Sequence, residues 1–363
     1  MNPMPTVSVI VPCRNEEDYI EKCIRSILAQ EPPPGGFEVI VADGISDDGT
    51  RDILQRLAEE DSRLQVVDNP ERVIPAGLNL AIRAAHGKVI VRVDAHTDYA
   101  SDYVRQCFEV LHETGADNVG GPWIAEGKGL IGRGIAAAFQ SPFAVGGALC
   151  HQSSYEGALD TVYLGCWPIE VFERIGLFDE ELVRSEDDEF NLRLTRAGGK
   201  IWQSPRIKSL YHPRESLKSL LQQQLQYGYW KVRVIQKHKI PASIRHLIPG
   251  CFVLLLMFLG LAAPWSNVAL WSWIGLGGIY LLCNLAASIL TGSRFGWALF
   301  PLFPVVFAFY HFGYGYGFLR GLLDFLVLQR QPTNAYTKLT RPSAGDSLRS
   351  GGAGQRDRSF RRA

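Results

Sequence analysis

Residues 247–328 form a stretch of 82 residues with only three charged side chains, namely Arg294, Arg320 and Asp324. Apolar runs cover residues 247–264, 268–291 and 295–319. Each is long enough to cross a hydrocarbon core of about 30 Å at 1.5 Å per residue. A buried globular helix pair is the alternative, but soluble helices rarely stay apolar on every face for so long. The pattern predicts three or four transmembrane passes, with residues 320–328 continuing the third run or lying in the membrane interface.

The formal net charge of zero conceals two different halves. Residues 1–210 hold 33 acidic and 20 basic side chains, whereas residues 211–363 hold 4 acidic and 17 basic ones. A hydrophobic content of 47% excludes disorder for the bulk of the chain, and the charge balance gives no reason to expect a nucleic-acid partner. The seven cysteines lack disulfide or zinc spacing and no secretory signal begins the chain. We therefore expect the acidic half to face the cytosol.

The acidic half alternates between short apolar runs and helix-like segments. Strands are predicted at residues 7–11, 37–42, 65–67 and 88–93, and helices at residues 17–30, 50–60 and 75–85. Strands separated by helices of 10–15 residues predict an α/β fold with a doubly wound, mostly parallel sheet. Because ligands bind at the carboxyl ends of the strands in such sheets, the residues directly after each strand are the candidate site.

Polar residues follow three of these strands. They are Pro12, Asn15 and Glu16 after the first, Asp43 and Asp48 after the second, and Asp94 and His96 after the fourth. An Asp at a strand end can accept a hydrogen bond from a base or a ribose hydroxyl. Asp94 and His96 could reach one divalent cation bridged by a pyrophosphate. Taken singly, each motif is also compatible with a turn, a helix N-cap or a strand-end cap.

As an ordered set, the motifs are more specific. VSVIVPCRNEE, FEVIVADGISDDGT and VIVRVDAHTD are followed by GCWP and by FDEELVRSEDDEFNLRLTRAGGKIW (residues 178–202). This set resembles the inverting family 2 glycosyltransferases of GT-A (Rossmann-like) fold, and within them the succinoglycan-type exopolysaccharide transferases. The resemblance covers about residues 1–240 and the membrane helices that follow.

The resemblance implies roles for the strand-end residues. Pro12, Asn15 and Glu16 would border the donor nucleotide, Asp43 would contact uracil, and Asp48 would lie in the loop beside it. Asp94 and His96 occupy the positions that hold the diphosphate and a divalent metal, Mn²⁺ or Mg²⁺. His96 replaces the second Asp of the common pattern. Because imidazole suits Mn²⁺ better than the harder Mg²⁺, we expect a preference for Mn²⁺.

The run Glu186 to Glu189 contains the pair that matches the family's catalytic ED, in which Asp187 would be the base and Glu186 would lie at the donor. Inversion requires a carboxylate on the face opposite the leaving UDP, to take the proton of the acceptor hydroxyl. Four consecutive acids repel one another, which raises the pKa of a carboxylate. The alternative is an acidic helix start with Ser185 as its N-cap.

Residues 226–230 (QYGYW) lie where related transferases place QxxRW, so Trp230 would also contact the donor. Tyr229 replaces the Arg of that motif, so Lys231 or Arg233 would have to supply the missing charge. The alternative is an aromatic, basic helix that anchors at the membrane surface. Residues 215–239 hold five Lys and Arg against one Glu, so we expect this helix on the anionic leaflet.

The expected organisation is therefore a GT-A domain (1–205), an amphipathic interface or acceptor segment (206–246), transmembrane helices (247–328) and a basic, disordered tail (329–363). The tail from residue 330 has eight basic and two acidic residues, which favours an even number of passes or a re-entrant last segment. The expected location is the bacterial inner membrane, with the catalytic domain in the cytosol and with homo-oligomers possible.

The expected reaction moves a sugar, with glucose as the first guess, from a UDP-sugar to a hydroxyl of a polyprenyl-diphosphate-linked saccharide in exopolysaccharide assembly. Direct transfer to polyprenyl phosphate or ceramide, and processive polymerisation, are alternatives within enzymes. A membrane-tethered nucleotide-binding subunit without catalysis is the alternative outside them. The retained Asp94 and Asp187 argue against that last reading.

Overall fold

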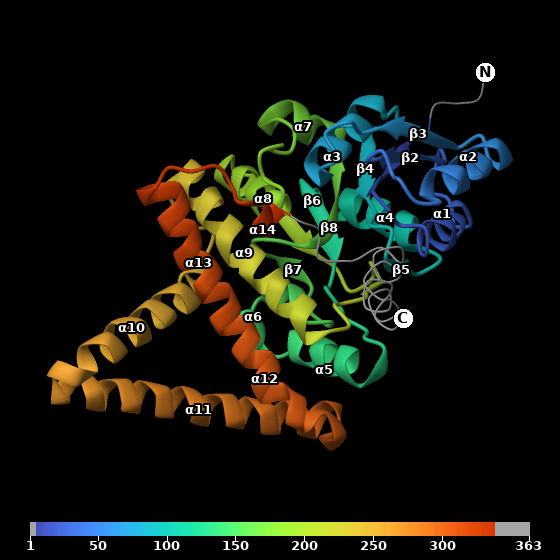
Figure 1. Ribbon diagram of the computed structural model, residues 1–363. Coiled ribbons are helices and arrows are strands. Elements are labelled where there is room, and N and C mark those ends of the chain that lie inside the picture. The colour runs from blue at the N-terminus through green and yellow to red at the C-terminus, as the bar shows by residue number, and fades with distance from the viewer. Residues whose placement is uncertain (1–4, 338–363) are drawn as a thin grey trace, which may run out of the picture.

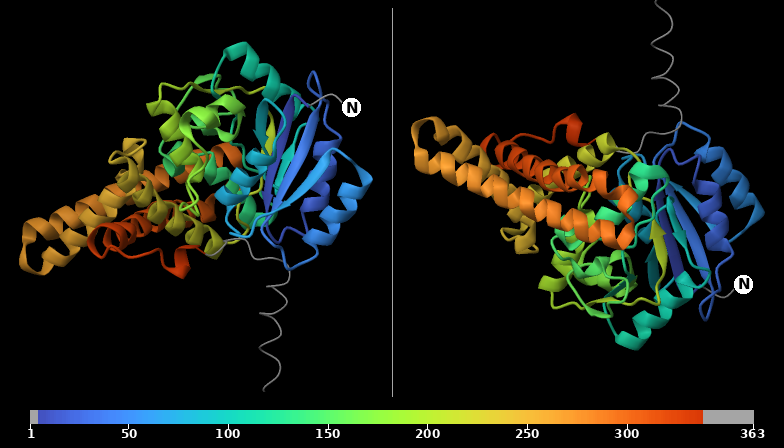
Figure 2. Two further views of the ribbon diagram at one scale, coloured as in Figure 1. Left: turned by 90° about the horizontal axis from the view of Figure 1, so that it is seen from above. Right: turned by 90° about the horizontal axis from the view of Figure 1, so that it is seen from below.

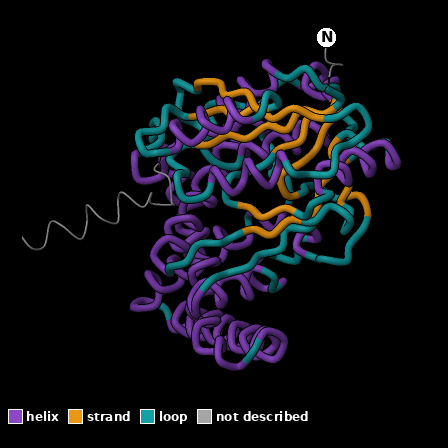
Figure 3. The backbone as a smooth tube through the Cα atoms, turned by 90° about the vertical axis from the view of Figure 1, so that its right-hand side faces the viewer, coloured by secondary structure: helices purple, strands orange, loops and turns teal. Residues whose placement is uncertain are grey.

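The computed structural model describes residues 5–337. It has an N-terminal α/β domain and a group of long C-terminal helices, and Figure 3 shows the strands gathered on one side and these helices on the other. The part of the predicted disordered tail beyond residue 337 lies outside the residues that the structure describes.

The first half of the domain has the predicted βα alternation. The elements are β1 (Val7–Cys13), α1 (Ile20–Leu28), β2 (Phe37–Asp43), α2 (Thr50–Glu60), β3 (Leu64–Asp68), α3 (Ile74–Ala84) and β4 (Val89–Arg92). β1 pairs in parallel with β2 and β4, and β2 pairs in parallel with β3. All four strands therefore end at one edge of the sheet, as the sequence predicted.

The second half of the domain extends this sheet and adds a separate two-stranded sheet of β5 and β10. It contains β5 (Thr97–Tyr99), α4 (Tyr103–Thr114), β6 (Asn118–Gly121), α5 (Gly129–Phe139), α6 (Pro142–Val145), β7 (Gly157–Ala158), β8 (Tyr163–Pro168), α7 (Ile169–Ile175), α8 (Glu186–Arg196), β9 (Ile201–Gln203) and β10 (Ser209–Tyr211). The strand order is β3-β2-β1-β4-β8-β6-β9-β7, with β8 antiparallel to both of its neighbours. β10 pairs with β5, so the domain continues past the expected boundary at residue 205.

Side chains that alternate in direction along the central strands form a hydrophobic core on each face of the sheet. Val9 and Val11 of β1 face the side covered by α1, α2 and α4, whereas Ile10 packs on the other side with α3, α7 and α8. Because successive side chains of a strand point to opposite faces, a strand buried on both sides reads as a continuous apolar run. Figure 2 shows helices on either side of this sheet.

Four long helical segments follow the domain. α9 (Leu217–His238) comes first, and three apolar helices follow, each long enough to cross a membrane by length and composition: Ile244–Trp265, Asn267–Phe295 and Trp297–Val327. The first contains α10 (Ile248–Ala262), the second is α11, and the third contains α12 (Phe303–Ala308) and α13 (Tyr314–Gly321). Figure 1 shows α10 and α11 as a hairpin that projects away, while α12 and α13 run beside α9.

The segment around α9 differs from the expected helix on an anionic leaflet. The basic residues in its C-terminal half pair with acids of the α/β domain: Lys231 with Asp188, Arg233 with Glu181, and Lys237 with Asp179 and Glu181. These charges therefore hold α9 against the domain instead of facing lipid headgroups. The short helix α14 (Asn334–Thr337) also packs on α9, where Tyr336 stacks on Tyr229.

Candidate active site

The loops after β1 and β2 are tied together by side-chain hydrogen bonds. Asn15, in the left-handed region at φ +54°, donates to Asp47 over 2.6 Å and accepts from the Asp47 backbone N–H. The backbone N–H of Glu16 donates to the Thr50 hydroxyl over 2.9 Å, and Asp48 accepts from the backbone N–H of Thr50. The DGISDDGT segment is thus a turn that caps α2 and, in addition, joins two strand ends into one rigid rim.

Asp43 lies at the base of this rim and is fully buried. Its carboxylate accepts from the Ser46 hydroxyl and pairs with Arg51 over 2.8 Å. Burial of a charge is tolerated when it is paired in this way. Asp43, which is predicted to contact uracil, therefore also fixes the loop that follows β2. The contact to the base itself stays a prediction.

Asp94 and His96 lie after β4 at the same edge, and Pro12 is the penultimate residue of β1. The Asp94 carboxylate is 20% exposed, and His96 Nδ1 lies 3.5 Å from Glu16 Oε1. Residues 5–337 contain no group of three or more His, Cys, Asp and Glu able to hold a metal. The Asp94 carboxylate and the His96 imidazole would supply two ligands to a cation, which would take its remaining ligands from a diphosphate and water.

Arg92 connects this edge to the start of α8 and was missed by sequence reasoning. Its guanidinium pairs with Asp94 over 3.1 Å and with Glu186 over 3.3 Å, and its side chain is only 7% exposed. Burial alone would lower the pKa of Arg92, but the two carboxylates raise it, so the cation is fixed. A lone charge inside a buried strand, VIVRV, was the available signal.

The four acids at the start of α8 have separate surroundings. Glu186 pairs with Arg92, Asp188 with Lys231, and Glu189 with Arg193 and His238. Asp187 is the one acid of this run without an ion pair to the described residues; its Oδ1 accepts from the Asp188 backbone N–H over 2.8 Å. The first turn therefore presents one carboxylate that is free to act.

The pKa of Asp187 is raised to about 7 by burial and then by the negative charges of Glu186 and Asp188, while Arg92 opposes the shift. Burial would also raise the pKa of Asp188, but the Lys231 ammonium outweighs it and lowers that pKa. A carboxylate that titrates near neutrality suits proton abstraction. Ser185 occupies the N-cap position of α8, as the alternative interpretation expected, but its side chain makes no capping hydrogen bond and its φ of +63° is left-handed.

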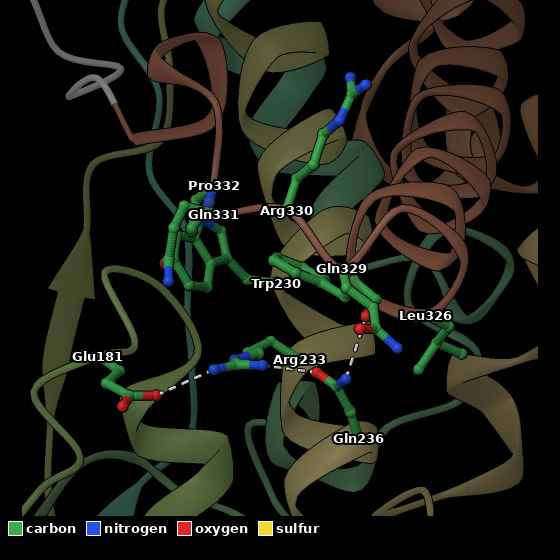
Figure 4. A pocket seen from close by; sticks show the side chains of 10 residues that line it. Glu181, Trp230, Arg233, Gln236, Leu326, Gln329, Arg330, Gln331 and Pro332 are labelled. Atoms are coloured by element: carbon green, nitrogen blue, oxygen red, sulfur yellow. Dashed lines mark hydrogen bonds and ion pairs between the residues drawn. The ribbon is translucent and has the colours of Figure 1, made fainter.

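The QYGYW residues lie between helices. The Trp230 indole N–H donates to the Tyr336 carbonyl over 3.0 Å, and its ring is 1% exposed. Trp230 also borders a cavity of about 570 Å³ between α9 and the end of the third apolar helix, where Figure 4 shows Arg233 between Glu181 and Gln236. Neither Trp230 nor Arg233 hydrogen-bonds to the strand-end residues, and Lys231 is engaged by Asp188. Packing between helices is the role that the structure shows for Trp230.

Comparison with known proteins identifies the family. Residues 8–139 match the family described as glycosyl transferase family 2. The succinoglycan biosynthesis protein ExoA of Rhizobium meliloti (strain 1021) is 30% identical over 323 residues, which cover 87% of this chain and 95% of that protein. This chain belongs to glycosyl transferase family 2.

Two further similarities extend this family assignment. The dolichyl N-acetyl-α-D-glucosaminyl phosphate 3-β-D-2,3-diacetamido-2,3-dideoxy-β-D-glucuronosyltransferase of Methanococcus voltae is 26% identical over 88% of this chain and 98% of that protein. The mannosyltransferase PcManGT from Pyrobaculum calidifontis, solved with GDP-Man and Mn²⁺, aligns with a TM-score of 0.57 at 20% identity over 88% of each chain. The family 2 transferase therefore has the GT-A fold expected from its sequence.

Proposed function

We propose that this transferase moves a sugar from a UDP-sugar to a hydroxyl of a polyprenyl-diphosphate-linked saccharide, with inversion at the anomeric carbon. The observation that carries the proposal is the arrangement around Arg92, which joins the strand-end residues at Asp94 to the acidic start of α8. One side of this arrangement suits a nucleotide diphosphate and the other offers the unpaired carboxylate of Asp187. A donor and an acceptor can therefore be held on opposite sides of the transferred carbon.

In this mechanism, Asp187 takes the proton of the acceptor hydroxyl as the oxygen attacks the anomeric carbon from the face opposite the leaving nucleotide. The bond to the UDP oxygen breaks as the new glycosidic bond forms, which gives a β-linkage from an α-linked donor. Glu186 positions Arg92 and keeps negative charge beside Asp187. The rim of Asn15, Glu16 and Asp48 would border the nucleoside, with Pro12 and Asp43 beneath it.

Asp94 and His96 would hold a divalent cation at the diphosphate. Bound there, the cation would stabilise the negative charge that builds on the leaving group. The Mn²⁺ in the solved mannosyltransferase supports a divalent metal for this fold. The choice of Mn²⁺ over Mg²⁺ rests on the imidazole of His96.

The acceptor and the location follow from the relatives and the apolar helices. One relative is named for succinoglycan biosynthesis and another for transfer to a dolichyl-linked sugar, and a saccharide held on a polyprenyl lipid would combine both features. The apolar hairpin of α10 and α11 would place the enzyme in the bacterial inner membrane with its α/β domain in the cytosol. Glucose remains the first donor to test.

The deciding experiment measures radiolabelled transfer and UDP release with membranes containing the enzyme, a panel of UDP-sugars and extracted lipid-linked saccharides. We expect transfer with one donor, and loss of at least 100-fold in Asp187→Asn with UDP binding retained. Asp61→Asn, in the exposed loop between α2 and β3, is the matched control and should keep full activity. A wild-type enzyme silent with every donor would favour a non-catalytic nucleotide-binding subunit, and an active Asp187→Asn would exclude the base assignment.

A further inference from the structure

The third apolar helix, Trp297–Val327, touches the α/β domain along its first half and α9 along its second half. In the first half, the centroid of the Phe307 ring lies 5.3 Å from that of Phe143 in α6, and His311, at the middle of the helix, donates from Nε2 to the Phe143 carbonyl over 2.7 Å. At its end, the Phe325 carbonyl accepts from Gln236 of α9 over 3.1 Å. A helix that crossed a bilayer and led away from the α/β domain would contact that domain at one end only.

Between these ends, a row of glycines brings the third apolar helix into close contact with α9. Gly313, Gly317 and Gly321 are spaced four residues apart and face residues of α9 that are spaced in the same way. A Cβ at Gly317 would lie 2.1 Å from the Leu225 carbonyl oxygen, and one at Gly321 would lie 2.7 Å from the Tyr229 carbonyl oxygen. Small residues at this spacing let two helix backbones approach closely along their length. The two helices therefore run side by side.

α9 itself is fixed to the α/β domain. Lys231 is buried against Asp188, and Lys237 pairs with Asp179 and Glu181. Removing one partner of the buried Lys231–Asp188 pair would leave the other charge uncompensated, so α9 does not leave the domain easily. A helix packed along α9 must then follow the surface of the domain instead of the bilayer normal.

The outward side of the third apolar helix is itself apolar. Val305, Phe312, Tyr316 and Leu323 are between 37 and 54% exposed, at spacings of seven, four and seven residues that keep them on one side of a helix. α10 and α11 instead leave most of their apolar side chains exposed and project away from the domain in Figure 1, while part of each packs on the third apolar helix, where Gly250 faces Phe318 and Gly292 faces Trp297. With one face packed on the protein and the other face apolar, the helix can lie along the leaflet with its open face in the acyl boundary.

We propose that the third apolar helix lies in the plane of the leaflet on the catalytic side, with its apolar face in the acyl boundary, and does not cross the bilayer. Only the α10–α11 hairpin crosses, so the chain returns to the catalytic side before Trp297 and stays there. This inference rests on the membrane attachment proposed above. It places the basic end of the chain, with eight Lys and Arg from residue 330 onward, on the cytosolic side, in agreement with the positive-inside rule.

The test measures depth in the bilayer with spin labels on single cysteines in the full-length, membrane-reconstituted protein. Cys251 and Cys283 are exposed and are first replaced by Ala, whereas the other five cysteines are buried and unreactive. A label at Phe258→Cys, in the second half of α10 and 65% exposed, serves as the deep reference. UDP release in each labelled variant confirms that the enzyme is folded.

Labels at Val305, Phe312, Tyr316 and Leu323 should all lie at one shallow depth, well above the label at Phe258. Labels at Phe312 and Tyr316 as deep as the reference, with Val305 and Leu323 shallower, would overturn the proposal in favour of a third pass. A reference label that is itself accessible to water would refute the membrane attachment instead. A C-terminal tag should also be cleaved by protease only from the cytosolic side.

Discussion

The pKa of Asp187 offers the sharpest test of the proposed chemistry. The structure raises this pKa to about 7, through burial and through the adjacent Glu186 and Asp188. A base must be ionised to act, so its active fraction is about 0.1 at one pH unit below the pKa and about 0.9 at one unit above. We therefore expect kcat/KM to rise about tenfold between pH 6 and pH 8 and to level off above that. The assay is UDP release at low donor concentration with saturating metal.

His96 carries an imidazole beside the proposed cation, so the same profile should also be measured in His96→Asp. If Asp187 carries the ionisation, the midpoint near pH 7 persists in that variant even when its rate changes. A midpoint that disappears with the imidazole, or a flat profile in the wild type between pH 6 and pH 8, would refute the assignment.

The raised pKa also affects stability, with a definite sign. The folded state binds the Asp187 proton more tightly than the unfolded chain, whose pKa is near 3.9, so the free energy of unfolding falls as the pH rises from about 4 to 7. Asp187→Asn removes this penalty. Its thermal midpoint should exceed that of the wild type by a margin that grows over this range and then stays constant. A margin independent of pH would show that Asp187 is not perturbed in the folded protein.

Three further predictions follow from individual contacts. Arg92→Met leaves two carboxylates without their buried cation. It should lower the free energy of unfolding, measured by denaturant titration, by about 3–5 kcal/mol and should abolish most of the turnover. Arg92→Lys should recover part of both the stability and the turnover. His96→Asp should shift the metal preference from Mn²⁺ toward Mg²⁺ in the UDP-release assay, and a wild type far faster with Mg²⁺ than with Mn²⁺ would contradict the reasoning. Gly317→Leu should abolish the packing of the third apolar helix on α9 and lower the thermal midpoint in detergent, whereas Gly275→Leu, where a Cβ meets nothing within 4 Å, should leave it unchanged.

Local patterns were enough to predict the first half of the domain. The continuous apolar runs of β1, β2 and β4 predict strands buried on both faces, and parallel pairing then brings the loop at Asp43 and the residue Asp94 to one edge. The second half was less predictable because β8 enters the sheet antiparallel between β4 and β6. That pairing joins residues distant in sequence, and no periodicity in either segment specifies its partner.

The contacts of α9 were missed for a related reason. An amphipathic, basic helix has the same composition whether its charges face lipid headgroups or carboxylates elsewhere in the chain. Only the fold reveals that Lys231 meets Asp188 and that Trp230 is covered by α14. The glycines at 313, 317 and 321 were visible in the sequence, and their four-residue spacing was the signal for close helix packing.

The acidic run at the start of α8 links these parts. Adjacent acids are unfavourable unless cations compensate them, and here the cations come from three places: Arg92 from the sheet edge, Arg193 from α8 itself, and Lys231 from α9. Removing everything after residue 205 would take Lys231 away and leave Asp188 as an uncompensated charge beside Asp187. The helix that packs on the membrane part therefore compensates a charge directly beside the proposed base, so the α/β domain and its attachment form one functional unit.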